Sequence, residues 1–222
     1  MGQDTNLINF IIALVGVIGT GVGITASLIP MELIGQRDSY QRTVNTWRLL
    51  ISEMHRIKKL CDVISAELKH AIEIATENGI EPRFINYIAL EGLQPILMNG
   101  EFISQLPSDV RITLLDLYDA VTLMNVMTSQ YSNYIANVLI VYEGKDYSTS
   151  IVEFYNIIHE RCLMVGKYFQ QLEPEIIDQE KMALEKVLGL QRWISFLKWF
   201  GAIIFTGVIA ACVFLAFIYI RH

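Results

Sequence analysis

Two long apolar runs dominate this sequence, one near each end. The first covers residues 7–29 and the second 199–220, which are 23 and 22 residues without a charged side chain. At about 1.5 Å per residue, either run reaches roughly 33 Å as a helix, enough to cross a hydrocarbon core of about 30 Å. The sequence therefore predicts two transmembrane helices, with tails at 1–6 and 221–222 and a domain at 31–198 between them.

The first run could instead be a signal peptide, because Thr25, Ala26 and Ser27 form a small-residue cleavage site. Two observations argue against its removal. Residues 1–6 hold no Lys or Arg, and the run is longer than a signal-peptide core of about 7–15 residues. We expect the segment to remain as a span.

Basic residues set the expected orientation, because Lys and Arg close to a span are retained on the cytoplasmic side. Seven of them flank the inner ends of the runs: Arg37, Arg42, Arg48, Lys181, Lys186, Arg192 and Lys198. The outer tails hold only Arg221 and His222. We predict a multi-pass protein of the cell inner membrane with 31–198 in the cytoplasm. Its interface anchors would be Trp193, Trp199 and Tyr219.

The composition fits one membrane-tethered domain. The mean hydropathy is +0.39, and the two runs contribute most of it. The net charge of −6 offers no basic face, so no direct nucleic-acid binding is expected. The three cysteines show neither a disulfide framework nor zinc spacing. Because Cys61 and Cys162 fall at apolar helix positions, we expect both to be buried free thiols in a reducing compartment.

The hydrophobic period between the runs is helical almost throughout, which predicts an all-α fold, a helical bundle flanked by two transmembrane helices. One seam passes through Leu114, Leu117, Val121, Met124, Thr128, Tyr131, Ile135, Val138 and Tyr142. A second passes through Ile151, Tyr155, Ile158, Cys162, Val165, Phe169 and Leu172. A third helix, at about 40–77, should be covered on two sides. One face holds Val44, Trp47, Ile51, Met54, Cys61, Leu68 and Ala75, and the other Leu50, Ile57 and Ile64.

Prolines and glycines predict where these helices begin and end. A fourth helix is expected to begin at Pro174 and to continue into the second span, because only Gly189 and Gly201 interrupt it. Pro30 and Gly35 predict a break or kink beneath the first span. In a continuous fourth helix, movement in the domain would pass directly into the bilayer.

Helix breakers cluster between residues 78 and 107, where only short helices fit, at 84–93 and 102–106. A long irregular connection of this kind is a common place for a partner or ligand to bind. Its apolar residues favour instead a hydrophobic lid over one end of the bundle: Phe84, Tyr87, Ile88, Leu93, Ile96, Leu97 and Phe102. We favour the lid and keep the binding site as the alternative.

No group of residues predicts catalysis. Glu67 and His70 give a single Glu-x-x-His, but a di-iron bundle needs this motif twice, and Asn156 stands where His159 would need a glutamate. No nucleophile elbow surrounds a serine or cysteine. The glycines of the first run lie in an apolar segment without a following lysine, unlike a phosphate loop. We expect no catalytic, cofactor or metal site, and an enzyme ranks last among the function classes.

Each span carries a face of small residues at intervals of four, which lets helix backbones approach closely in lipid. These faces are Gly19, Gly23 and Ser27 on the first span and Ala202, Thr206 and Ala210 on the second. The partner helix can belong to the same chain or to another copy, so a homo-oligomer stays open. Neither span holds a charge, which argues against a transporter. A weakly selective pore lined by Thr20, Thr25 and Thr206 is compatible with an oligomer, although such hydroxyls more often bond within their own helix.

In layout, the chain resembles the two-transmembrane effectors of bacterial antiviral defence systems, including the membrane partner encoded beside some retron reverse transcriptases. The likeness consists of the span at 7–29, the span at 199–220 and the helical domain between them. It implies abortive infection: a protein or nucleoprotein partner encoded nearby keeps the effector silent, and its release damages the membrane. The alternative is a membrane-tethered scaffold or accessory subunit of a larger complex. Membrane lipid is a partner in both.

Overall fold

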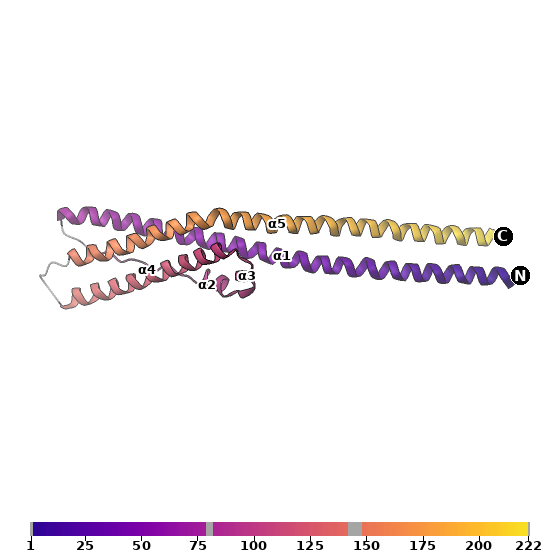
Figure 1. The fold of residues 1–222 in the computed structure, drawn as a ribbon, viewed down its shortest axis with the longest axis horizontal. Helices are drawn as coiled ribbons and strands as arrows, with labels where there is room; N and C mark the ends of the chain where they lie inside the picture. Colours follow the sequence, from indigo (N-terminus) through magenta and orange to yellow (C-terminus); the bar gives the residue numbers. More distant parts are fainter. Residues whose placement is uncertain (1, 79–81, 142–147, 222) are drawn as a thin grey trace. The chain divides into compact units, whose positions relative to one another are not determined.

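The computed structural model describes residues 2–78, 82–141 and 148–221, and all the regular secondary structure in these ranges is α-helix (Figure 1). Side chains are described for Ala13, Gly16, Gly19 and Thr20, for 31–74, 82–137 and 149–214, and for Phe217. The helices in these ranges are α1 (Gly2–Asn78), α2 (Gln94–Met98), α3 (Gly100–Gln105), α4 (Ser108–Val141) and α5 (Ser148–Arg221). The predicted all-α fold class is confirmed.

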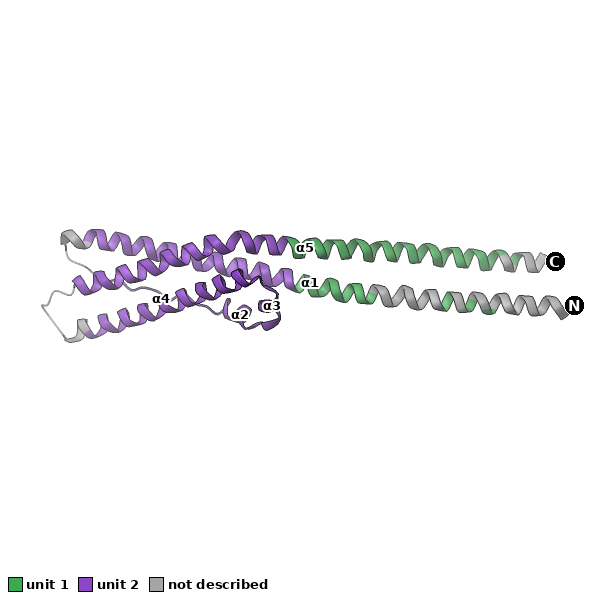
Figure 2. Cartoon of the chain, in the orientation of Figure 1, with its two compact units in different colours: residues 1–42, 182–222 green, residues 43–181 purple. Residues whose placement is uncertain are grey.

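Helices α1 and α5 contribute to two compact units (Figure 2). Unit 2 is Thr43–Lys181, and unit 1 consists of Met1–Arg42 and Met182–His222. In unit 1, the Lys186 Nζ lies 5.3 Å from the centre of the Tyr40 ring, and Val187 and Ile194 are buried. The predicted domain at 31–198 contains the whole of unit 2.

Unit 2 is a three-helix bundle in which α1 and α4 run parallel and α5 runs antiparallel to both. Three contacts give the direction of α1 against α5: Arg48 with Glu180, His55 with Glu173, and Ser65 with His159. Two others give the direction of α4: Met124 with Cys162, and Tyr131 with Tyr155. Because α1 and α4 are parallel, the chain between them must return along the bundle, roughly 50 Å at 1.5 Å per helical residue. This topology explains the long irregular connection.

The predicted seams form the core of unit 2. Every seam residue of α4 from Leu114 to Ile135 is buried, while Val138 and Tyr142 lie outside the described side chains. All members of the α5 seam are buried as well. Both apolar faces of α1 are buried, as expected for a helix covered on two sides: Val44, Trp47, Leu50, Met54, Ile57, Cys61, Ile64 and Leu68. Ile51 is half-buried, and Ala75 lies outside the described side chains.

The helix start predicted at Pro174 is wrong, and so is a break at Pro30 and Gly35, where a break or a kink was expected. Helix α1 continues without a break through Pro30 and Gly35, and α5 continues through Pro174, where a separate helix was expected to begin. A proline inside a helix costs about 3 kcal/mol, which strong packing can offset. Leu172 and Ile176, on either side of Pro174, are both buried. The predicted continuity into the second apolar run is confirmed, because α5 is one helix as far as Arg221.

Candidate functional site

The connection at residues 82–107, here called the strap, lies along the side of the bundle. It has no regular secondary structure over 82–90 and then forms α2 and α3. It returns from the level of Tyr155 to that of Trp47, whose ring centre lies 4.8 Å from that of Phe102. The predicted position over one end of the bundle is wrong, and so is a helix at 84–93. The short helix predicted at 102–106 is confirmed in part by α3.

A pair of buried tyrosines forms the first anchor of the strap. The backbone N–H of Arg83 donates to the hydroxyl oxygens of Tyr131 at 3.2 Å and Tyr155 at 2.8 Å, and these oxygens lie 3.0 Å apart. Burial, together with the hydrogen bond to Tyr155, raises the pKa of Tyr131 because the phenolate would be poorly solvated. Tyr131 is therefore a neutral hydrogen-bonding hydroxyl at neutral pH, and this anchor joins the strap to α4 and α5.

Two further anchors bind the strap backbone. Asn125 on α4 accepts from the Ile88 N–H at 2.9 Å through its Oδ1 and donates from its Nδ2 to the Ile88 carbonyl at 2.8 Å. Arg56 on α1 donates to the Ala89 carbonyl and pairs with the Glu53 carboxylate at 2.8 Å. All three helices of the bundle thus contribute a side chain to the strap backbone.

The inner side of the strap is apolar. Six of its side chains are buried: Ile85, Ile88, Leu93, Ile96, Phe102 and Leu106. Among the residues predicted to form the lid, Phe84 and Tyr87 are instead exposed, at 91% and 55%, and Leu97 is half-buried. The strap is therefore a lid over the side of the bundle that leaves two aromatic rings in contact with solvent.

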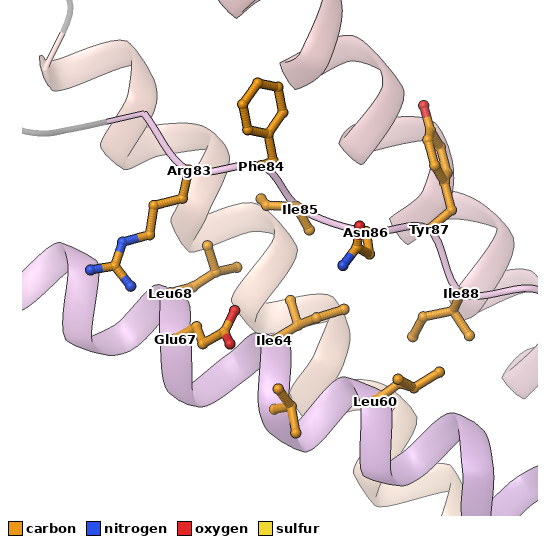
Figure 3. Close-up of a pocket in the computed structure, with 11 residues that line it drawn as sticks. Leu60, Ile64, Glu67, Leu68, Arg83, Phe84, Ile85, Asn86, Tyr87 and Ile88 are labelled. Atoms are coloured by element: carbon orange, nitrogen blue, oxygen red, sulfur yellow. The ribbon is translucent and has the colours of Figure 1, made fainter.

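A small pocket lies between the strap and α1 (Figure 3). It is lined by Leu60, Val63, Ile64, Glu67 and Leu68 of α1 and by residues 83–88 of the strap, and its volume is about 110 Å³. Sites for small molecules usually measure about 300–1,000 Å³. The pocket is thus better matched to a single side chain of a partner than to a cofactor.

The histidines of α1 and α5 lie on helix surfaces. Glu67 and His70 are both exposed. His159 shares a hydrogen bond of 2.9 Å with the Ser65 hydroxyl, and His55 lies 3.3 Å from the Glu173 carboxylate, so both join α1 to α5. Within the described part of the chain, no three His, Cys, Asp or Glu side chains are grouped so that they could hold a metal ion.

One helix among the described residues, α5, is long and apolar enough to cross a membrane. Its most apolar stretch has a mean hydropathy of 2.0 and contains no buried residue. The expected anchors Trp193 and Trp199 are 61% and 63% exposed, while Tyr219 lies outside the described side chains. The first apolar run, 7–29, belongs to α1, but most of its side chains also lie outside the described set.

Four members of the small-residue faces have described side chains: Gly19, Ala202, Thr206 and Ala210. Gly19, Ala202 and Ala210 are exposed, and apart from its own helix turn no described atom lies within 4 Å of the position that a Cβ of Gly19 would take. Thr206 is exposed too, and its hydroxyl donates to the Ala202 carbonyl at 2.8 Å, within its own helix. Gly23 and Ser27 lie outside the described side chains. Close packing through these faces stays a prediction.

Sequence reasoning missed the strap anchors. Asn125 and Arg56 have the pattern of surface residues on amphipathic helices, and the Arg83 N–H belongs to the backbone of an irregular segment. One signal was present, because Tyr131 and Tyr155 both lie in apolar seams. A buried tyrosine hydroxyl usually has a hydrogen-bond partner, so the two positions predict a polar contact inside the core.

Comparisons with known proteins do not place the chain in a family. No protein-family model, curated protein or solved structure matches it. What the protein does must therefore follow from two features of its own: a strap with exposed aromatic rings, and a helix that leads from the bundle into an apolar stretch.

Proposed function

We propose that this protein is a membrane effector of an antiviral, abortive-infection system, held in the cell inner membrane by spans at 7–29 and 199–220. Unit 2 lies in the cytoplasm and binds a protein or nucleoprotein partner that keeps the effector silent. Release of the partner lets the spans perturb the membrane. The observation that carries this proposal is the continuity of α5 from the core of unit 2 to Arg221.

The side chains of α5 support lipid as the surroundings of its second half. Tyr155 and Cys162 are almost fully buried in unit 2, whereas Trp199, Phe205 and Val213 are 63%, 68% and 63% exposed. Removing a large apolar side chain from water gains about 1.5–3 kcal/mol. A row of such residues is therefore stable in lipid and costly in water. Because the same helix continues into the apolar stretch, a movement of α5 in the bundle would also move the part of α5 that contacts lipid.

The strap supports a protein partner on unit 2. Beside Phe84 and Tyr87, the pocket residues Leu60 and Val63 are 38% and 47% exposed. Exposed apolar surface that includes aromatic rings commonly marks protein interfaces. Because the strap is bonded to Tyr155 of α5, a partner that holds the strap would also restrain α5.

Expression of the full chain without its neighbouring genes tests the proposal. We expect growth arrest and a fall in membrane potential, measured with a voltage-sensitive dye. Phe205→Lys combined with Ile209→Lys should be harmless, because each lysine near the bilayer centre costs about 2.5–3.5 kcal/mol. The matched control, Phe205→Leu with Ile209→Leu, keeps the span apolar and should stay toxic at equal expression.

Two results would contradict the effector. A full chain that is harmless at high expression, even with every neighbouring gene deleted, favours the tethered scaffold or accessory subunit. Toxicity that survives the two lysines would show that the membrane is not the target. For the partner site, Phe84→Ala with Tyr87→Ala should increase toxicity when the neighbouring genes are present, because the silencing partner is lost.

A further inference from the structure

One layer of the bundle core brings together a sulfur atom from each of the three helices. Cys61 lies on α1, Met124 on α4 and Cys162 on α5, and their exposed fractions are 1%, 0% and 3%. The Cys162 thiol donates to the Met124 Sδ at 3.4 Å. Cys61 lies at the level of Cys162, because Ser65, one turn further along α1, is hydrogen-bonded to His159, one turn earlier on α5. Both cysteines are free thiols. We call these three residues the sulfur layer.

The sulfur layer lies between layers without charged side chains. Ser65 and His159, which lie one turn away, are half-buried and hydrogen-bonded to each other. The neighbours at this distance that face the core are all buried: Ile57, Ile64, Val121, Thr128, Ile158 and Val165. The only polar side chain among them, Thr128, already donates its hydroxyl proton to the Met124 carbonyl at 3.0 Å. Thiol and thioether sulfurs are therefore the side-chain donors that the bundle offers at this level.

Soft sulfur donors of this kind select Cu(I), whereas structural zinc takes four ligands and hard cations take oxygen. We propose that the sulfur layer is a binding site for one Cu(I) ion, held by Cys61, Cys162 and Met124. Three sulfurs around one metal at about 2.3 Å would lie about 4 Å from one another. The 3.4 Å between Cys162 and Met124 needs only a small expansion to reach this geometry. Cysteine binds metals as the thiolate, so both thiol protons leave when one Cu(I) ion binds, and the occupied site carries one net negative charge.

A disulfide between Cys61 and Cys162 is the competing chemistry. Both thiols are almost entirely buried, with exposed fractions of 1% and 3%. Because the thiolate is the species that reacts with oxidants, a buried protonated thiol is a poor site for oxidation. Cu(I) differs from an oxidant because the bond that it forms to sulfur offsets the cost of removing the thiol proton.

Competition with a coloured Cu(I) chelator, bicinchoninate, tests the site on the full chain purified in detergent without oxygen. The wild type should take one Cu(I) per chain, and X-ray absorption should show sulfur neighbours only. Cys162→Ser should lower the affinity by more than about 100-fold, and Met124→Leu by about 10-fold, since even outer-shell changes weaken metal sites by about 10–100-fold. Cys212→Ser is the matched control and should bind as the wild type does.

Several outcomes would overturn the site. The wild type could leave all Cu(I) with the chelator, Cys162→Ser could bind as tightly as the wild type, or Cys212→Ser could abolish binding. Circular dichroism shows whether each variant keeps its helix content. If Cys162→Ser unfolds, Met124→Leu, which replaces one apolar side chain by another of similar size, decides the question. None of these results depends on toxicity, so this site and the proposed effector function can fail separately.

Discussion

Gly92 shows how closely the strap lies against α1. A Cβ at this position would meet the Glu53 carboxylate, which pairs with Arg56 at 2.8 Å. Gly92→Ala would displace this carboxylate and disturb the bond from Arg56 to the strap, so we expect a loss of about 1 kcal/mol in unfolding free energy. Gly166→Ala on α5 is the control. Apart from its own helix turn, no described atom lies within 4 Å of its Cβ position, and alanine stabilises a helix by about 0.5–1 kcal/mol over glycine. In chemical denaturation in detergent, the unfolding midpoint should fall for Gly92→Ala and rise for Gly166→Ala.

The Tyr131 anchor makes stability depend on alkaline pH. Its pKa is raised above the usual value of 10 by burial and by the bond to Tyr155. Above pH 10 the folded state therefore keeps a proton that the unfolded state loses. The contribution of Tyr131 to the unfolding free energy is complete below pH 10 and declines as the pH rises further. Tyr131→Phe should flatten the fall in unfolding free energy above pH 10. Tyr87→Phe, at an exposed position, should keep the slope of the wild type.

Residues were predictable from the sequence where burial follows the helix period. Leu114 and Phe169 lie on seams that any amphipathic helix of this kind would bury. Asn125 was not predictable, because its two bonds go to the backbone of Ile88, 37 residues away. Periodicity reports which face of a helix is covered, but it does not report which loop covers it.

At the scale of elements, Pro174 lies inside α5 although it cannot donate a backbone hydrogen bond. Pro174→Ala restores that bond, and we expect the unfolding free energy to rise by about 1–3 kcal/mol. Glu175→Ala, at the next exposed position, should change it by less than about 0.5 kcal/mol. If Pro174→Ala is neutral or destabilising in chemical denaturation, the proline fits its local backbone without a penalty.

The helices themselves were largely predictable, but their arrangement was not. The seams of α4 and α5 are clear in the sequence, whereas the break suggested by Pro30 and the helix start suggested by Pro174 are absent. Proline disfavours a helix locally, and packing on both sides of it decides the outcome. The parallel direction of α1 and α4 depends on contacts between distant residues, such as Tyr131 with Tyr155. The path of the strap along the bundle follows from that direction.

At the scale of the whole molecule, the distribution of basic residues predicts that both tails lie outside the cytoplasm. Alkaline phosphatase fused after His222 should be active, because it folds only after export. A cytoplasmic reporter inserted within 143–148 should be active as well. The same two fusions in a variant with Arg37, Arg42 and Arg48 changed to glutamine should show mixed orientation, since these residues retain the segment inside. An exported 143–148 segment in the natural chain would reverse the topology and exclude a cytoplasmic bundle.

Coupling between the bundle and the membrane should depend on the continuity of α5. Gln191 is exposed and lies between unit 2 and the apolar run. An insert of seven residues after Gln191 adds about two helical turns and preserves the phase of the helix. An insert of alanines should keep the helix continuous and leave toxicity and its silencing by the partner intact. A glycine-serine insert of equal length should uncouple them, because it interrupts the helix while bundle and span still form. Membrane potential, measured with and without the neighbouring genes, separates the two inserts. Equal behaviour of both would mean that signals reach the membrane by a route other than α5.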